Sequence, residues 1–298
     1  KLMPIATPSR SAVMLVNCPA FDWCYGCSAT AGAMIAGYYD RNYHPDMYTG
    51  PTNGGVVPLD NSIWGWGQCP LSATRMGYDG LTEKGHVDDF WVYSGSTAPD
   101  PYITGGWIPH AYEGCTADFM GTNQSALGNE DGATGFYFDS WGNPLVDFQA
   151  PPGNMDGCAG LRDFFESRGY NVNLNYSQLL PGVIGNPYGY TFEEYKTEID
   201  NGRPVMIHLT GHSVVGVGYD NSDQTVYIHD TWDHSLHEMT WGGSYAGMTH
   251  KSVSVFHIAN ILGGTPEITV NTESIDEFLE IDQTSSQTIT ISNTGTDD

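Results

Sequence analysis

The feature that most constrains this chain is a cysteine pair, Cys24 and Cys27, followed at once by small and apolar residues. Apolar side chains recur there at the i, i+3, i+4, i+7 spacing of one buried helix face: Ala31, Met34, Ile35 and Tyr38. The spacing predicts a helix over residues 28–40. A thiol at a helix N-terminus meets unpaired N–H groups and the positive end of the helix dipole, which favour the thiolate. Cys27 is therefore a candidate nucleophile, although a cysteine before an Ala-rich helix is more often structural.

The charge balance limits the partners of the protein. Its 298 residues hold 35 Asp and Glu against 10 Lys and Arg, for a formal net charge of −25. Nucleic-acid binding needs a basic surface, and anionic membranes attract basic segments, so we expect neither partner. The chain contains no run of 18 or more apolar residues, so we expect no membrane-spanning segment. The acidic composition, with few lysines, indicates a secreted, extracellular protein, which we expect to be a monomer.

Six cysteines are confined to the first part of the chain: Cys18, Cys24, Cys27, Cys69, Cys115 and Cys158. If Cys27 is a free nucleophile, five remain. These five could form at most two disulfides and leave one thiol over.

Secondary-structure signals are sparse in the middle of the chain and clear after residue 156. Residues 43–155 are rich in Gly, Pro, Trp and Tyr and predict ordered loops, with helices only at 83–91 and 116–121. Later helices are predicted at 160–168 and 191–200, the second with a capping box made by Thr191 and Glu194. Strands are predicted at 204–209, 214–219, 225–229 and 252–258, with one more between 241 and 251. Residues 12–16 are predicted to form an edge strand or a packed arm.

A composition change after Gly263 and Gly264 predicts a domain boundary. Residues 1–262 would form the main domain. Residues 263–298 are rich in Thr, Ser, Asp and Glu and alternate apolar with polar residues at two places. They resemble a linker and the incomplete start of an immunoglobulin-like β-sandwich, which needs about 100 residues. A packed tail is the alternative.

A histidine and an aspartate can be brought together by two of the predicted strands. His212 opens a valine-rich strand, and Asp230 ends the next one. A hairpin loop of three or five residues would place His212 directly opposite Asp230, with Cβ atoms about 4.5–5.5 Å apart. A carboxylate there could fix the imidazole tautomer, while the other ring nitrogen faces Cys27.

These residues also carry a resemblance to a known superfamily. The run Cys24-Tyr25-Gly26-Cys27-Ser28 is similar to the Cys-Gly-Ser-Cys-Trp of papain-like cysteine peptidases. Residues 193–233 are closer to the bacterial branch that includes the double-glycine-leader, bacteriocin-processing peptidases. There a helix precedes Gly-x-Pro-Val, then Gly-His-x-Val-Val-x-Val-Gly-Tyr-Asp and a strand ending in Asp. Asp230-Thr231-Trp232-Asp233 also resembles the papain-type Asn-Ser-Trp-Gly.

The resemblance implies an α+β, papain-like fold. An N-terminal helical part would carry the nucleophile, followed by a C-terminal antiparallel sheet and a short β-rich C-terminal segment. It also implies a cysteine endopeptidase acting through a thioester, with Cys27 as nucleophile, His212 as general acid/base and Asp230 as orienting group. Trp232 would shield the His–Asp contact from water. No cofactor is required, and the substrate is a peptide or protein.

The same resemblance implies two disulfides. Cys24 would pair with Cys69, with Cys18 as the competing partner, and Cys115 would pair with Cys158.

One family feature is missing from the sequence. Papain-like enzymes place an oxyanion-binding Gln six residues before the nucleophile, where this chain has Phe21. The nearest polar candidates are Asp22, which could donate only when protonated, and Asn17. The backbone N–H of Cys27 is a further donor.

Metal-binding signals are weaker than those of the triad. Five histidines cluster in sequence without a zinc-binding spacing: His208, His212, His229, His234 and His237. The acidic turns at 129–132 and 220–223 could hold a structural calcium ion.

Two other functions share these features. A cysteine-dependent amidase or transglutaminase-like acyltransferase would use the same order of Cys, His and Asp. An inactive homologue that binds peptides or glycans would explain the missing Gln.

Overall fold

The computed structural model describes residues 12–24, 26–45, 47–48, 52–62, 69–72, 90–93, 96–99, 115–122, 127, 129, 132–259, 268–270 and 291–293. The chain divides into two compact units, Lys1–Ala259 and Asn260–Asp298. The candidate catalytic residues all lie in the first unit.

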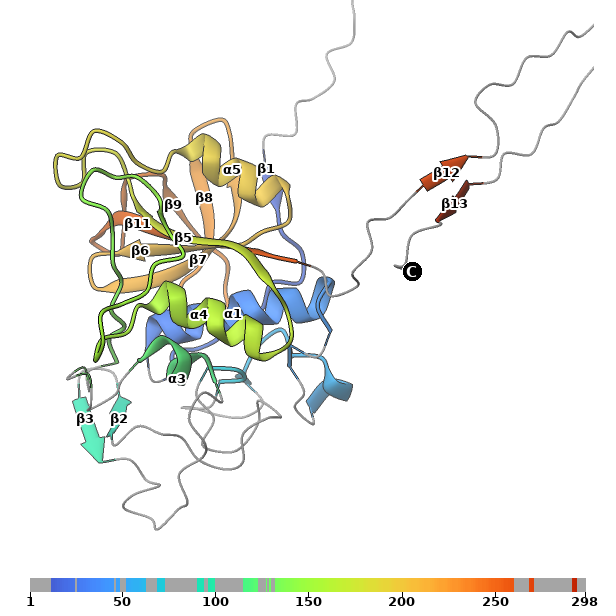
Figure 1. Cartoon of the computed structure of the whole chain (residues 1–298), viewed down its shortest axis with the longest axis horizontal. Helices are drawn as coiled ribbons and strands as arrows, with labels where there is room; N and C mark the ends of the chain where they lie inside the picture. The colour runs from blue at the N-terminus through green and yellow to red at the C-terminus, as the bar shows by residue number, and fades with distance from the viewer. Residues whose placement is uncertain are drawn as a thin grey trace, which may run out of the picture. The chain divides into compact units, whose positions relative to one another are not determined.

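An antiparallel sheet of nine strands forms the frame of the first unit (Figure 1). Seven strands follow the order β4-β5-β11-β6-β7-β8-β9, while β1 pairs with β7 and β10 with β11. The strands are β1 (Ala12–Met14), β4 (Leu145–Val146), β5 (Val172–Leu179), β6 (Val205–Leu209), β7 (His212–Asp220), β8 (Thr225–His229), β9 (His237–Thr240), β10 (Ser244–Tyr245) and β11 (Met248–Ile258).

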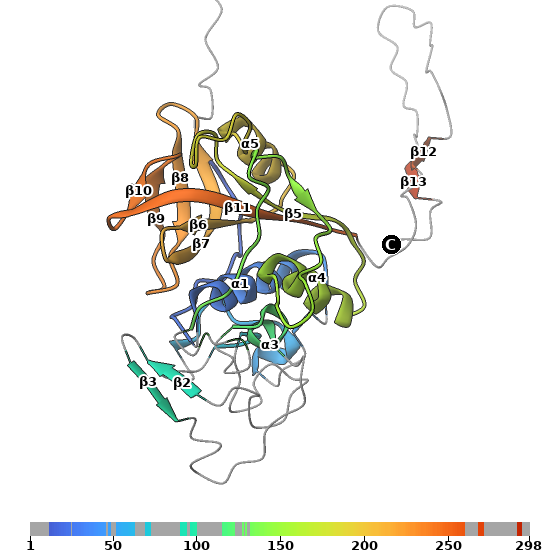
Figure 2. The ribbon, with the colours of Figure 1, turned by 60° about the vertical axis from the view of Figure 1, so that its left-hand side comes forward.

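Helices cover both faces of this sheet. On one face lie α1 (Cys27–Asn42) and α4 (Gly157–Ser167), with α3 (Thr116–Met120) packed against them, and α5 (Phe192–Asp200) covers the other (Figures 1 and 2). A 3₁₀ turn, η1 (Thr52–Gly55), follows α1 in the chain. The mixture of helices with a large antiparallel sheet confirms the predicted α+β class.

Two apolar cores result from the alternation of side chains along the strands. On β6, Met206 packs toward α1 and α4, whereas Val205 and Ile207 pack toward α5. On β11, Phe256 belongs to the first core and Val255 to the second. Strands apolar on both faces are typical of a sheet that is covered on both sides.

Local signals set the helix ends. The capping box of Thr191 and Glu194 is present, and α5 begins at Phe192 as its motif predicts. Helix α4 starts three residues before its predicted beginning, because Asp156 caps it by accepting a hydrogen bond from the Ala159 N–H at 3.0 Å. Strand β5 was not predicted, since its polar residues Asn175, Ser177 and Gln178 are buried and hydrogen-bonded to protein groups rather than facing solvent.

The predicted register of the β7–β8 hairpin is wrong. Asp220 pairs with Thr225, so the loop has four residues, and a bulge lies between Gly216 and Gly218. The last pair of the ladder is Val215 with His229. His212 is therefore not directly opposite Asp230, because both the loop length and the bulge change the register.

Part of the predicted structure lies outside the described residues. Of the predicted helix 83–91, only residues 90–91 are described, and they belong to strand β2 (Phe90–Tyr93), which pairs with β3 (Ser96–Pro99). In the second unit, β12 (Ile268–Val270) pairs with β13 (Ile291–Asn293). That residues 263–298 begin an immunoglobulin-like sandwich stays a prediction. Among the described helices, none has the length and apolar character needed to cross a bilayer.

Candidate active site

Cys27 is the first residue of α1, as the sequence predicts, and Gly26 precedes it as the N-cap. Gly26 has φ 148°, and a Cβ there would lie 2.4 Å from Thr122 Cγ2 and 2.6 Å from the carbonyl oxygen of Gly132. Only glycine fits this close approach of three chain segments. The turn before α1 thus fixes where the Cys27 side chain emerges.

His212 is brought to Cys27 by a tight turn between β6 and β7. Leu209 pairs with His212, and the two intervening residues include Gly211 at φ 76°, a left-handed conformation that favours glycine. Strand β7 also packs against α1. His212 is therefore the first residue of a buried strand that packs against α1, the helix that begins with Cys27.

The hydrogen bonding of His212 determines its tautomer. Its Nε2 lies 2.8 Å from the main-chain carbonyl oxygen of Asp230. A carbonyl only accepts, so Nε2 carries a proton and Nδ1 is left to interact with Cys27. This is the arrangement in which a neutral imidazole can take the proton of a thiol.

Cys27 and His212 shift each other's ionisation. Burial disfavours the thiolate, but a hydrogen bond and charge attraction from His212, with smaller contributions from the Ser213 N–H and the Ser28 hydroxyl, lower the pKa of Cys27 below its usual 9.0. Burial likewise disfavours the imidazolium, but Cys27 and then Asp230 raise the pKa of His212 above its usual 6.5. Both shifts favour a thiolate–imidazolium pair.

The carboxylate of Asp230 binds groups other than His212. It accepts hydrogen bonds from the Trp232 N–H at 2.9 Å and from the Tyr245 hydroxyl at 2.7 Å, and His237 Nε2 lies 3.5 Å away. The residue thus orients His212 through its main chain, whereas its carboxylate holds the following turn in place. The sequence predicts this contact for the carboxylate, whereas in the structure the main-chain carbonyl makes it.

Trp232 covers the exposed side of the histidine. Its ring stacks on His212 with centroids 4.4 Å apart and an interplanar angle of 20°. Such a ring limits the access of water to the hydrogen bond between His212 and Asp230.

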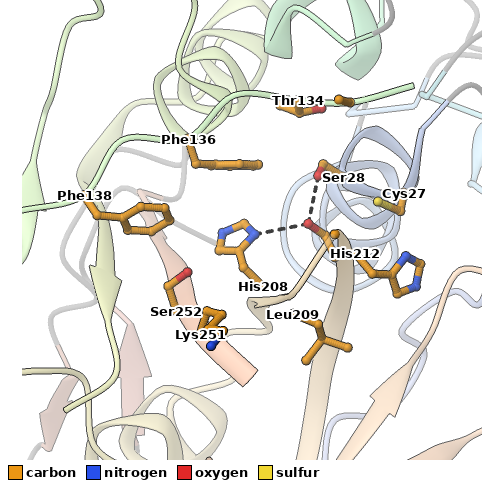
Figure 3. A pocket seen from close by; sticks show the side chains of 13 residues that line it. Cys27, Ser28, Thr134, Phe136, Phe138, His208, Leu209, His212, Lys251 and Ser252 are labelled. Atoms are coloured by element: carbon orange, nitrogen blue, oxygen red, sulfur yellow. Dashed lines mark hydrogen bonds between the residues drawn. The ribbon is translucent and has the colours of Figure 1, made fainter. Parts of the chain in front are cut away.

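A cavity of about 320 Å³ opens beside Cys27 (Figure 3). Its described lining comes from the α1 start, from the segment before α4 and from strands β6, β7 and β11. Phe136, Phe138 and Leu209 form apolar walls, while Cys27 and His212 lie together at one side. A chain bound there would lie within reach of the thiol.

Comparison with known proteins gives a family match for one segment of the chain. Residues 150–252 match the model of the Peptidase_C39 like family. The match covers less than half of the chain and supports its predicted resemblance to the papain-like cysteine peptidase superfamily. The matched segment includes His212 and Asp230 and ends two residues before Ser254. No curated protein and no solved structure matches the chain, and membership of the double-glycine-leader branch stays a prediction.

The papain-like oxyanion donor is replaced by an apolar residue that the structure buries completely. Phe21 is 0% exposed, and its N–H lies 3.3 Å from the sulfur of Met34. Asp22 lies outside the described lining of the cavity, and its carboxylate is 3.2 Å from His234 Nε2. Asn17 is exposed in a turn after β1. The Cys27 N–H, at the first position of α1, has no intrahelical acceptor and is available as a donor.

The pKa of the Asp22 carboxyl is raised above its usual value, chiefly by burial. Asp233, Asp60 and Asp230 add to the effect, while His234 opposes it. Asp22 as an oxyanion donor stays a prediction.

All six cysteines are thiols in this structure, so neither disulfide implied by the resemblance is formed in it. Cys69 lies near Cys24: burial, then Cys24 and Asp22, raise the pKa of Cys69 well above 9.0. Cys158 receives a hydrogen bond from Asn175 at 3.6 Å, and burial raises its pKa to about 12. The pKa of Cys27, in contrast, is lowered.

The predicted histidine cluster separates into different surroundings. His208 is buried in the sheet, His229 contacts the Ser235 carbonyl at 3.3 Å, and His234 contacts Asn61 at 2.9 Å. Among the described residues, one group has metal-liganding distances: Asp230, Asp233 and His237. Its carboxylates are already hydrogen-bonded to neighbouring protein groups.

Of the two predicted calcium turns, that at 220–223 is fully described. Its Asp220 carboxylate accepts from the N–H and hydroxyl of Ser222, and Asp223 accepts from the Thr225 N–H. Turn 129–132 is described only in part. Calcium binding stays a prediction.

Three polar side chains near Cys27 were not predicted from the sequence. Ser28 and Ser213 directly follow Cys27 and His212 in the chain, and their hydroxyls lie 2.8 Å apart. His208 contacts Ser213 at 3.1 Å. The two serines could have been found because each directly follows a candidate site residue in the sequence. His208 could have been found because it is a polar residue inside an otherwise apolar strand.

Proposed function

We propose that the protein is a cysteine endopeptidase that hydrolyses peptide bonds through Cys27, His212 and Asp230. The observation that supports it best is the pairing of Cys27 and His212 beside an open cavity. The Nε2–H of His212 is bound to the Asp230 carbonyl, so its Nδ1 is left for the thiol.

The reaction then follows from these groups. His212 Nδ1 takes the Cys27 proton, and the thiolate attacks the carbonyl carbon of the substrate peptide bond. The Cys27 N–H donates to the developing oxyanion. His212 returns the proton to the leaving amine, which leaves a thioester on Cys27. Water, deprotonated by His212, attacks this thioester and releases the acid and the free thiol.

The location and assembly are also part of the proposal. A net charge of −25 keeps copies of the chain apart and suits an extracellular medium. We propose a secreted monomer that acts on peptide or protein substrates.

The test separates hydrolysis from acyl transfer. Purified protein is incubated with casein in the presence and absence of a primary amine, and the products are identified by mass spectrometry. We expect cleaved peptides with free carboxyl ends and no amine incorporation. Incorporated amine would favour the acyltransferase alternative. Intact casein together with a slowly alkylated Cys27 would favour the inactive binding homologue.

A substitution at Asp230 tests how this residue acts. Asp230→Asn keeps the main-chain carbonyl that binds His212 and the side-chain oxygen that accepts from Trp232, but removes the negative charge. We expect kcat/KM to fall by about tenfold, far less than the roughly 10⁴-fold loss seen where a triad carboxylate itself holds the histidine. A loss as large as that of a His212 substitution would mean that the carboxylate is the orienting group.

A further inference from the structure

A row of buried polar side chains crosses the sheet beneath the proposed nucleophile. Ser213, His208, Ser254 and Ser177 lie on the adjacent strands β7, β6, β11 and β5, all on the face that packs against α1 and α4. His208 pairs directly with Ser213, and Ser254 with Ser177. Each is at most 6% exposed. A polar row inside an apolar sheet is costly unless every group is hydrogen-bonded.

The row is continuous and reaches Cys27. Ser177 and Ser254 hydroxyls are 2.7 Å apart, Ser254 lies 2.8 Å from His208 Nε2, and His208 Nδ1 lies 3.1 Å from the Ser213 hydroxyl. Ser213 in turn lies 2.8 Å from Ser28 (Figure 3). The Ser28 hydroxyl is adjacent to Cys27 in the chain and is one of the groups that lower the pKa of its thiol.

The direction of these bonds follows from the chemistry at the Cys27 end. A thiolate only accepts, so the Ser28 hydroxyl donates its single proton to Cys27. Ser28 must then accept from Ser213. Because the Ser213 hydroxyl donates its only proton to Ser28, it must accept a hydrogen bond from the Nδ1–H of His208.

The other end of the row is then determined as well. Burial, with a smaller effect from His250, lowers the pKa of His208 to about 3, so the ring is neutral and has one donor and one acceptor. With Nδ1 as donor, Nε2 accepts from Ser254, and Ser254 accepts from Ser177. The Phe136 ring, with its centroid 4.2 Å from that of His208, covers the imidazole.

We infer that His208 is a positioning residue for the proposed thiol chemistry: as the Nδ1–H tautomer it directs a chain of hydroxyl donors at the sulfur of Cys27. The inference rests on the proposed function in taking Cys27 as the reacting group. Aligned hydrogen bonds polarise one another, and those to an ionised acceptor are the strongest, so the chain stabilises the thiolate.

The tautomer is measurable without any substrate. The ¹⁵N spectrum of the full chain labelled in its histidines is assigned for His208 by comparison with a His208→Asn variant. We expect a protonated Nδ1 and an unprotonated Nε2 at neutral pH. A protonated Nε2 would overturn the inference, because the donor chain would then be broken at His208.

The effect on Cys27 is measured by its rate of alkylation with iodoacetamide as a function of pH, with the labelled site identified by mass spectrometry. Ser213→Ala removes the link but keeps the Ser213 N–H and His212. In this variant we expect the midpoint of the curve of alkylation rate against pH to move to higher pH. At pH values below that midpoint, alkylation of Cys27 should be about three- to tenfold slower than in the wild type. An unchanged midpoint would overturn the inference.

Two substitutions at His208 separate donation from packing. His208→Asn places an amide donor where Nδ1 stands, whereas His208→Leu fills similar volume without a donor. We expect the Asn variant to keep most of the wild-type midpoint and the Leu variant to behave like Ser213→Ala. Equal midpoints for Asn and Leu would show a packing role only. If the Leu variant does not fold, the spectrum and Ser213→Ala still decide.

No other charged group explains such a shift. Among the described residues, His212 on β7 is the titratable group that acts on Cys27, His250 on β11 acts on His208, and Lys251 on β11 lines the cavity. Cys158 on α4 interacts with Ser177 and Ser254 at the other end of the row, where burial raises the pKa of its thiol and keeps it neutral. All four are unchanged in these variants. Alkylation needs no peptide, so a shifted midpoint without casein cleavage would contradict the proposed function and leave this inference standing.

Discussion

Replacing Cys27 with alanine is expected to lower kcat/KM for peptide hydrolysis by about 10⁴-fold or more, to the limit of detection. The thiolate is the group that attacks the substrate, and removal of a nucleophile from such a constellation costs about as much as removing all its members. The measurement is the cleavage of a fluorogenic peptide by the purified variant, with its folding checked by circular dichroism.

The matched control removes a different thiol. Cys18 is half-buried, and burial raises its pKa far above 9.0, so it carries no thiolate at neutral pH. Cys18→Ala should keep the wild-type activity. Peptide cleavage that persists in Cys27→Ala, or that is lost in Cys18→Ala, would contradict the assignment of the nucleophile.

Replacing His212 with glutamine is expected to lower kcat/KM by about 10²- to 10⁴-fold, the usual contribution of a general acid–base group. Glutamine can still donate to the Asp230 carbonyl, but it can neither take the thiol proton nor carry the positive charge that lowers the Cys27 pKa. The rate of Cys27 alkylation at neutral pH should therefore fall as well.

The pH profile identifies this role. In the wild type, activity should rise with pH as Cys27 ionises, at a pH below 9.0, because its pKa is lowered. Activity should fall again as His212 loses the proton that it gives to the leaving amine. This fall should occur above pH 6.5, because the pKa of His212 is raised. In His212→Gln the alkaline limb should disappear and the acid limb should move toward pH 9. An unchanged bell-shaped profile would exclude His212 as the acid.

Several structural features could be predicted because they depend on residues close together in the chain. The helix after Cys27 follows from its apolar spacing, and the start of α5 from the capping box of Thr191 and Glu194. The α+β class followed from the resemblance and from the strand and helix patterns after residue 156. Interactions within one helical turn or one strand can be predicted from the sequence, because their geometry is the same in any fold.

Strand β5 and the hairpin register were not predictable in this way. The polar residues of β5 suit a buried strand only because Ser177 meets Ser254 of β11, from a segment far along the chain. The bulge between Gly216 and Gly218 shifts the pairing of β7 with β8 and leaves no clear pattern in the sequence.

The sequence by itself determined that Cys27 begins a helix, that His212 opens a buried strand and that Asp230 ends the next one. Only the tertiary structure decided that His212 meets the carbonyl of Asp230 rather than its carboxylate, and that His208 stands in a row of hydroxyls leading to Cys27. The physical reason is that hydrogen bonds across strands depend on register, bulges and side-chain direction, which are settled when segments distant in sequence pack together.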